Sequence, residues 1–316
     1  MAQKEWSLDE CLEWVRSHMV TRTAGYYGPR SAMWLIMREN MVPLGAISAV
    51  LLQVAHPAIA AAGTHSSRVR SDFNGRTRRT FAAVYEIIFG DTATASLTIE
   101  RIHRIHNRVR RESGEQPYRA SDPDLLFWVL ATLIDCSVRT YELLVGPLSL
   151  RDREDYYADM RMFGTAMGIP PDFMPPTWEG FEQYWEAMVN GNRLRIGETG
   201  SKLARFILGS AGARWSGSAA LVAGMLPERW RKAYGVAWGP KEQRRFAWTT
   251  RALRLAHRLM PASLRYCPAY HQALVRLAAA PRESKTLLAR AIGWTSRLLR
   301  LPWVLAPAQD HTSVRV

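Results

Sequence analysis

The chain has 316 residues, enough for one large domain or two closely joined halves, and 47% of them are hydrophobic. This composition excludes a disordered or low-complexity protein. The net charge of +14 is unevenly distributed: residues 1–191 hold 20 Lys and Arg against 23 Asp and Glu (−3), and residues 192–316 hold 22 against 5 (+17). A basic C-terminal part suits an anionic partner, either a lipid surface or a nucleic acid.

The cysteines and the N-terminus indicate the compartment. Cys11, Cys136 and Cys267 are far apart and odd in number, which argues against a disulfide framework or a structural zinc site. The polar, amphipathic N-terminal segment lacks the apolar core and cleavage site of a secretory signal. We therefore expect a cytoplasmic protein.

The longest apolar run, residues 41–63, would be long enough to span a bilayer. It contains Gln53 and His56, which would have to be satisfied inside hydrocarbon. We therefore interpret this run as one buried core helix, with a local bend where His56 is followed by Pro57.

Helical periodicity dominates the chain, and alternating strand patterns bounded by turn residues are not convincing, so we predict an all-α fold. Roughly six helices are expected in residues 1–191. Gly90 is expected to end one of them in the left-handed conformation. The expected helix starts carry cap residues: Asp91 or Thr92, Ser121 or Asp122 followed by Pro123, and Ser149.

The C-terminal part begins with residues 192–225, which are rich in small residues and predict a mobile connection or a loosely packed helix. Further helices are expected near 227–234, 240–260, 262–279 and 283–300. The last of these is basic and amphipathic, which fits either a core-facing terminal helix or contact with an anionic membrane. We thus predict a helical core over residues 1–191 and a basic helical extension over 192–316, packed on the same large domain.

Residues 96–111, SLTIERIHRIHNRVRR, hold the first candidate for chemistry. His106 falls on the same helical face as Ile102 and Val109, so we expect it to point inward, with His103 on the flank of that face. A single inward histidine is commonly a hydrogen-bonded core residue. A neutral imidazole in an apolar wall is also what heme iron requires, and periodicity alone leaves both interpretations open.

Residues 72–91, DFNGRTRRTFAAVYEIIFGD, predict a neighbouring helix. Thr80 lies on its apolar face together with Val84, and Arg76 and Arg79 lie beside that face in the first turns. Their guanidinium groups could pair with carboxylates at the rim of a pocket. A solvated basic face is the alternative.

Three further residues are candidates. His56 could be a buried structural donor or a ligand, and His65 is expected in a polar loop after the apolar run. Thr132, on a helix that also carries the i,i+4 pair Asp135 and Arg139, could present its hydroxyl to a pocket or bond it to the helix backbone. Motifs of nucleotide-binding proteins and hydrolases are absent: the sequence has no GxGxxG after a strand, no GxxxxGK[ST], no HExxH and no GxSxG.

Taken in order, LLQVAHPAIAAAGTHSS, DFNGRTRRTFAAVYEIIFGD, RIHRIHNRVRR and DPDLLFWVLATLIDCSVRTYE, followed by GPLS and YYADM, resemble the MpaB/rubber-oxygenase catalytic domain family. The resemblance is good from about residue 30 to 190 and looser in LPERWRKAYGVAW and RLMPASLRYCPAYHQA. It implies an all-α, globin-reminiscent fold with heme b, and oxidation of isoprenoid-like double bonds by O₂. The match of HNRVR to the family's His-x-x-Val-Arg implies that His106 is the axial iron ligand.

The distal side of such a heme departs from the family's pattern. The Arg-x-x-Lys-Thr pattern of rubber oxygenases reads here Arg76-Thr77-Arg78-Arg79-Thr80. Arginine cannot readily lose its proton, so Arg79 would not reproduce a lysine that binds and leaves the iron. The resemblance implies catalytic positions for Arg79 and Thr80, and from their places on the predicted helices we count Arg76 and Thr132 among the cofactor-binding candidates.

An acidic base is also missing, because no Asp or Glu occurs between Glu39 and Asp72. His65 or His56 could stand in for it. We count His65 among the catalytic candidates and His56 among the cofactor-binding ones.

The leading hypothesis is therefore a heme b-dependent oxygenase that acts with O₂ on a small hydrophobic, isoprenoid-like substrate. The alternative is a non-catalytic heme or lipid carrier or sensor, peripherally associated with membranes. A basic membrane-binding or nucleic-acid-binding helical protein is a third hypothesis. Because aromatic and basic residues are not interleaved on a recognition helix, we expect no nucleic-acid partner. The oligomeric state stays open.

Overall fold

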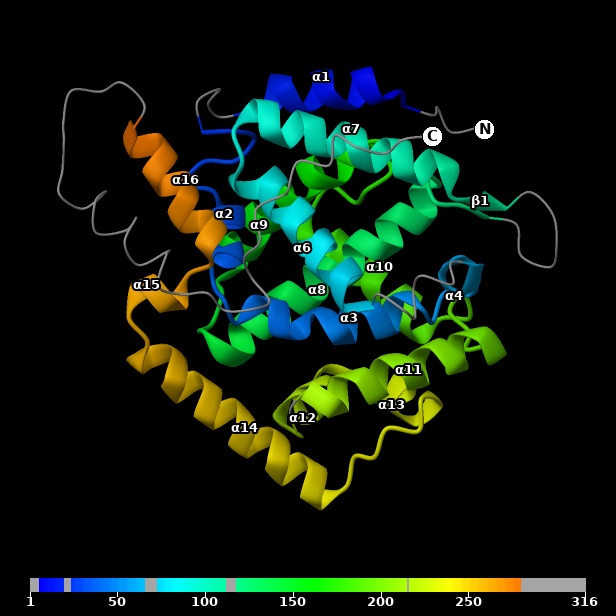
Figure 1. Cartoon of the computed structure of the whole chain (residues 1–316). Helices are drawn as coiled ribbons and strands as arrows, with labels where there is room; N and C mark the ends of the chain where they lie inside the picture. The colour runs from blue at the N-terminus through cyan, green and yellow to red at the C-terminus, as the bar shows by residue number, and fades with distance from the viewer. Residues whose placement is uncertain (1–5, 20–23, 66–72, 112–117, 215, 280–316) are drawn as a thin grey trace, which may run out of the picture.

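The computed structural model describes residues 6–19, 24–65, 73–111, 118–214 and 216–279. These residues form an all-α protein, as predicted, with one two-stranded hairpin (Figure 1). The expected helix over 283–300 lies outside the described residues. None of the helices in the described ranges is long and apolar enough to cross a membrane.

The core is built around α8 (Pro123–Leu144), which crosses the middle of the molecule (Figure 1). Side chains around its whole circumference are buried, Phe127, Trp128, Ile134 and Val138 among them, and a helix that is apolar all round needs neighbours on every side. Those neighbours form the inner layer: η1 (Val42–Gly45), α3 (Ala46–Gln53), α9 (Leu150–Ala166) and α14 (Pro240–Leu259).

Close packing against α8 depends on Gly45. A Cβ at this position would lie 2.1 Å from the Thr140 hydroxyl oxygen and 3.0 Å from the Cys136 carbonyl. Only glycine lets the η1 backbone approach α8 so closely. The contact brings the apolar run against the central helix.

That apolar run is not the single helix expected over residues 41–63. It divides into η1, α3 and α4 (Pro57–His65). Pro57 has no amide proton, and the preceding amides of Ala55 and His56 bond three residues back, to Leu52 and Gln53, at 3.3 and 3.0 Å. The bend at His56 is thus confirmed, and the proline turns it into a break.

Helices outside this core cover its flanks. Two of them, α1 (Leu8–His18) and α2 (Ala32–Met37), precede the core helices in the sequence. Between α4 and α8 in the sequence, α6 (Phe73–Phe89) and α7 (Thr92–Arg108) form an antiparallel pair. Asp91, in the turn between α6 and α7, is the N-cap of α7, because its side chain accepts a hydrogen bond from Thr94 N at 2.7 Å. This predicted cap is therefore confirmed. Ser149 likewise caps α9, and α10 (Trp178–Asn190) follows.

Gly90, in the turn between α6 and α7, does not adopt the predicted left-handed conformation. Among the described glycines, positive φ occurs at Gly25, Gly168 and Gly235. Glycine is required at position 90 for a different reason: a Cβ there would lie 2.1 Å from the Glu86 carbonyl oxygen.

The small-residue region is more regular than predicted, because it forms α11 (Glu198–Arg214) and α12 (Ser216–Met225). The basic part continues through α13 (Glu228–Ala233) and α14, and the helix expected over 262–279 is divided into α15 (Ala262–Arg265) and α16 (Pro268–Ala279). Pro268 starts the second piece, since it cannot donate the bond that would continue the first. α11 packs on α3 and α4, and α14 packs on α8 and α12.

Candidate functional site

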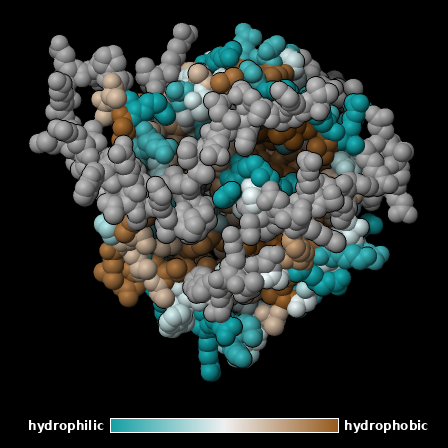
Figure 2. All heavy atoms as spheres, in the orientation of Figure 1, coloured by the Kyte–Doolittle hydropathy of each residue, from teal (hydrophilic) through white to brown (hydrophobic). Residues whose placement is uncertain are grey.

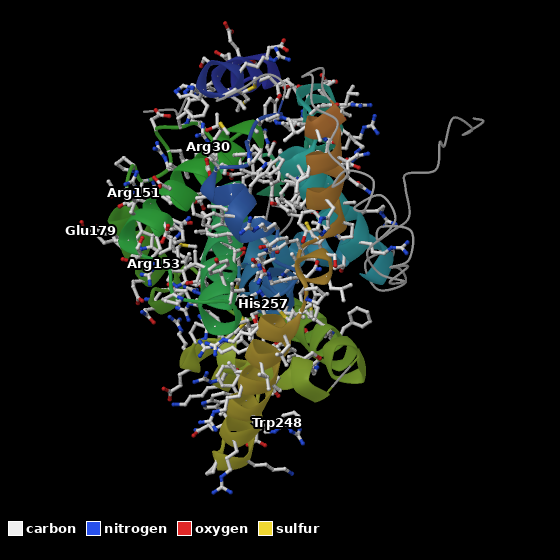
Figure 3. All side chains as sticks on the ribbon, turned by 90° about the vertical axis from the view of Figure 1, so that its left-hand side faces the viewer. Arg30, Arg151, Arg153, Glu179, Trp248 and His257 are labelled. Carbon is white, nitrogen blue, oxygen red and sulfur yellow. The ribbon has the colours of Figure 1, made fainter. Side chains whose placement is uncertain are left out.

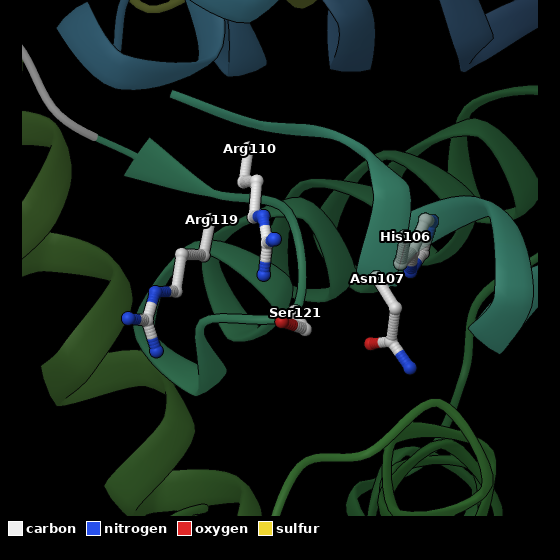
Figure 4. A pocket seen from close by; sticks show the side chains of 5 residues that line it. All are labelled: His106, Asn107, Arg110, Arg119 and Ser121. Carbon is white, nitrogen blue, oxygen red and sulfur yellow. The ribbon is translucent and has the colours of Figure 1, made fainter. Parts of the chain in front are cut away.

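The candidate site lies where α7 ends and the hairpin begins (Figure 4). The strands β1 (Arg110–Arg111) and β2 (Tyr118–Arg119) pair antiparallel, with Arg110 opposite Arg119. Two-residue strands are too short to show alternation, so this hairpin could not be predicted from the sequence pattern. It turns the chain from the last turn of α7 toward the start of α8.

His106 lines a cavity of about 170 Å³ at this place, together with Asn107, Arg110, Arg119 and Ser121. Its imidazole is partly buried, and its ring nitrogens have no hydrogen-bond partner among the described residues. Burial, followed by the neighbouring charges of His103 and Arg76, lowers the pKa of His106 to about 4. The ring is therefore neutral at physiological pH and has a free lone pair.

His103, one turn earlier on α7, is held differently. Its Nε2 donates a hydrogen bond to the Ala166 carbonyl at 2.9 Å. Gly168, at a φ of +100°, passes close to the same ring, since a Cβ there would lie 3.3 Å from His103 Cε1. Of the two histidines near the end of α7, His103 therefore has a nitrogen bonded to the backbone at the end of α9, whereas both ring nitrogens of His106 are free of hydrogen bonds to described residues.

Four of the five cavity residues were not among the sequence candidates: Asn107, Arg110, Arg119 and Ser121. Arg110 could have been found, since it ends the HNRVR segment that singled out His106. Of the two predicted caps of α8, Asp122 is the one that the structure shows, because its side chain accepts from Asp124 N at 2.9 Å. Ser121 instead lines the cavity. Arg119 follows residues 112–117 and had no signal in the sequence.

The cavity is cationic. Arg110 and Arg119 stand directly opposite each other on the two strands, and both line the cavity. Guanidinium groups are suited to binding a carboxylate or another anion.

The candidates on α6 lie near its N-terminal end. Arg76, Arg79 and Thr80 are exposed in the structure, so Thr80 does not share the burial of Ile87 and Ile88 farther along the helix. Although part of Arg76 is exposed, the atoms packed around its guanidinium group desolvate it, and this desolvation and the charge of Arg79 lower the pKa of Arg76 below its usual value. Because Arg76 in turn lowers the pKa of His106, the start of α6 lies close to the end of α7.

His56 lies near the start of α8, close enough for the charges of Asp122 and Asp124 to affect its pKa. It is partly buried, and its Nδ1 is buried without a hydrogen-bond partner among the described residues. Burial lowers the pKa of His56, with opposing effects from Asp124 and Arg193, which pair with each other. Residues 121–124 thus have His106 near one end and His56 near the other.

Two candidates do not enter the cavity with His106. Thr132 is fully buried, donates to the Val129 carbonyl at 2.7 Å and accepts from Gln53 Nε2 at 2.8 Å, so its hydroxyl joins α8 to α3. His65 is the last residue of α4, not part of a loop. Its side chain lies outside what the structure describes.

Comparison with known proteins defines the class. The chain matches the catalytic domain described as ER-bound oxygenase mpaB/B′/Rubber oxygenase over residues 33–255. The chain belongs to this family of oxygenase-type catalytic domains, as the resemblance had indicated.

Two mycobacterial proteins are similar to the chain along part of its length. They are uncharacterized protein Rv2237 of Mycobacterium tuberculosis and uncharacterized protein Mb2261 of Mycobacterium bovis. Each is 32% identical over 194 residues, which cover 59% of this chain and 74% of the relative. No solved structure matches the chain.

Proposed function

We propose that the protein is a heme b-dependent oxygenase that uses O₂ to oxidise a small hydrophobic, isoprenoid-like substrate. The observation that carries the proposal is the neutral imidazole of His106, which has no hydrogen-bond partner among the described residues and lines a cavity together with Arg110 and Arg119. A heme needs one protein ligand with a free nitrogen lone pair, and its carboxylates need cationic partners. Membership of an oxygenase family supports the reaction class.

The residues present fit such a group. Clusters of three His, Cys, Asp or Glu that could hold a bare metal ion are absent from the described residues, whereas His106 offers the single imidazole that an axial ligand requires. The cavity of about 170 Å³ is smaller than the roughly 300–1,000 Å³ of typical small-molecule sites, so the exposed side chains at its mouth would have to move on binding.

The residues of the chain would divide the work as follows. His106 would hold the iron, and Arg76, Arg110 and Arg119 would pair with the heme carboxylates. The bound heme would supply the activation of O₂. Arg79 and Thr80 would orient the substrate by hydrogen bonds, and His65 is the candidate to accept or donate a proton where the family's acid is missing.

His56 and Thr132 would act behind the site. The Nδ1 atom of His56 is buried near the start of α8 without a hydrogen-bond partner among the described residues. Thr132 links α8 to α3 through its hydrogen bond with Gln53. Both would set the position of the helices that border the cofactor.

Absorption spectroscopy tests the cofactor. Purified or hemin-reconstituted protein should show a Soret band that is lost in His106→Ala and retained in His103→Ala, because the His103 nitrogen is already bonded to Ala166. A folded wild-type protein that takes up no hemin would refute the heme proposal. Equal loss in both variants would refute the role of His106.

A non-catalytic heme or lipid carrier is the second candidate. It is favoured by Arg79 in place of a lysine and by the absence of acids between Glu39 and Asp72. Oxygen consumption by the heme-loaded protein with isoprenoid substrates separates the two: turnover supports the oxygenase, and heme binding without turnover supports the carrier.

The organisation and location are also proposals. Packing of α11 on α4 and of α14 on α8 supports one domain in which the basic part, 192–316, is joined to the core of 1–191. The free state of the three cysteines is consistent with a location in the cytoplasm. Limited proteolysis that releases a stable piece ending near residue 191 would argue against this organisation.

A further inference from the structure

Helix α14 presents large apolar side chains to solvent. Trp248, Leu255 and Leu259 are 68%, 58% and 75% exposed. They are seven and four residues apart, so they project from one face of the helix. Figure 2 shows a brown area at the lower left over the C-terminal half of α14, and in Figure 3 Trp248 lies at the lower end of the molecule.

This face is not the one that packs on the protein. The opposite side of α14 carries Thr249, Thr250 and His257, which are 2%, 8% and 5% exposed, and Phe246, which packs against Gly224 of α12. The helix therefore already has a buried side, and the apolar stripe of Trp248 and its neighbours is additional. Three large apolar side chains at such exposure on one helix face mark an interaction surface.

Arginines border the stripe. Arg244, Arg251 and Arg258 recur every seven residues along one edge of it and are exposed. None of the three forms an ion pair with a described residue. Arg254 shows what a structural arginine of this helix does instead: it donates to the carbonyls of Leu143 and Glu142, at 2.6 and 3.0 Å.

We infer that the outer face of α14, the stripe Trp248, Leu255 and Leu259 with Arg244, Arg251 and Arg258, docks the protein onto an anionic membrane surface. Apolar side chains in the middle of a helix face, a Trp among them, and cations along its edge are the arrangement of helices that lie in the lipid headgroup region. The arginines would contact lipid phosphates while the stripe enters the acyl boundary.

Charge and shape favour lipid over other anions. The part of the chain that contains α14, residues 192–316, carries +17, and the one acid within α14 is Glu242. A nucleic acid would use the arginines but would leave the leucines in water. This docking is independent of the heme, so neither proposal fails with the other.

Vesicle co-sedimentation tests the docking. The full chain should bind vesicles of phosphatidylcholine and phosphatidylglycerol in equal parts, more weakly at high salt, and should not bind phosphatidylcholine alone. Each basic side chain near such a surface contributes about 1 kcal/mol, so Arg244→Gln/Arg251→Gln/Arg258→Gln should lower the partition coefficient on the order of 100-fold.

Two further variants test the apolar stripe and provide a control. Trp248→Ala/Leu255→Ala removes part of the stripe and should also weaken binding. The control, Leu150→Ala/Arg151→Gln at the start of α9, removes an exposed leucine and an exposed arginine elsewhere and should not. Leu150 is 68% exposed, as is Trp248, and the Arg151 side chain is 90% exposed. Figure 3 shows Arg151 far from Trp248. Unchanged binding of the triple glutamine variant, or equal losses in the control, would overturn the inference.

A positional probe separates lipid from other occupants of this face. All three native cysteines are buried, so an environment-sensitive dye should label Leu255→Cys or Leu150→Cys selectively. The dye at 255 should shift to the blue with the anionic vesicles, and the dye at 150 should not. A blue shift already without vesicles would mean that the chain itself or, if it depends on protein concentration, a second copy covers the face. Either result would overturn the inference.

Discussion

His257 of α14 and Glu39, just after α2, form a buried pair in which Nε2 lies 2.8 Å from Oε2. Their side chains are 7% and 4% exposed, and they are 218 residues apart in the sequence. The pair joins the basic C-terminal part to the N-terminal core. Arg38, whose guanidinium lies 4.4 Å from the centre of the Tyr266 ring, extends the same contact.

Replacing one partner of this pair leaves the other buried without its hydrogen bond. Glu39→Leu and His257→Leu should each lower the free energy of unfolding by about 3 kcal/mol. The double variant should lose less than the sum, because neither the carboxyl of Glu39 nor the imidazole of His257 is left buried without the other. Urea unfolding of the four proteins measures the coupling.

The exposed pair Glu228 and Lys232 provides the control, since their side chains are 68% and 77% exposed. Glu228→Gln should leave the unfolding midpoint unchanged, because exposed pairs contribute little. Strictly additive losses at Glu39 and His257 would mean that the pair does not couple the two parts.

The periodic features were predictable from sequence, and the long-range ones were not. Local rules placed most helices and the caps Asp91 and Ser149, because a cap depends on residues within one turn. The contact between Glu39 and His257 depends on how α14 packs, which periodicity does not encode. In the same way, helical periodicity singled out His106 but not Arg119 and Ser121, which the chain brings to its cavity through a hairpin too short to show a pattern.

Helices α12 and α14 approach each other closely at Gly224, where a Cβ would lie 2.3 Å from the Phe246 ring. Gly224→Ala should therefore destabilise the protein by about 1–3 kcal/mol, because a packed aromatic ring must move. Gly209→Ala on α11 is the matched control: nothing lies within 4 Å of its Cβ position, and alanine should stabilise the helix by about 0.5–1 kcal/mol. The midpoints of thermal unfolding distinguish the two variants. Equal midpoints would show that the Phe246 ring moves aside without a cost in stability.

The pKa of His106 predicts a pH dependence. Burial lowers it from 6.5 to about 4, so between these values the unfolded chain binds a proton that the folded protein does not. This residue should therefore reduce stability as pH falls from 6.5 to 4. His106→Gln should lessen that part of the loss, while NMR of the wild-type imidazole should show it neutral at pH 6. An imidazole that titrates near 6.5 would contradict the burial that makes its nitrogen available.

Asp159 should act in the opposite sense. Its carboxylate accepts from Met33 N at 2.8 Å, at the start of α2, yet burial raises its pKa from 3.8 to about 6. Between these values the folded protein binds a proton that the unfolded chain does not, so this contribution to stability is lost as pH rises through 6. Asp159→Asn keeps an oxygen acceptor without the charge and should flatten the difference in unfolding free energy between pH 4 and pH 7.

Asp152 supplies a control of opposite sign for the Asp159 variant. Hydrogen bonds from Ser149 lower the pKa of Asp152, so its contribution is present at neutral pH and lost as pH falls. Asp152→Asn should therefore cost more stability at pH 7 than at pH 3, whereas Asp159→Asn should be more favourable at pH 7 than at pH 4. Urea unfolding midpoints measured across this pH range test both predictions. If the midpoint of Asp159→Asn changes with pH in parallel with that of the wild type, the Asp159 carboxylate is not desolvated.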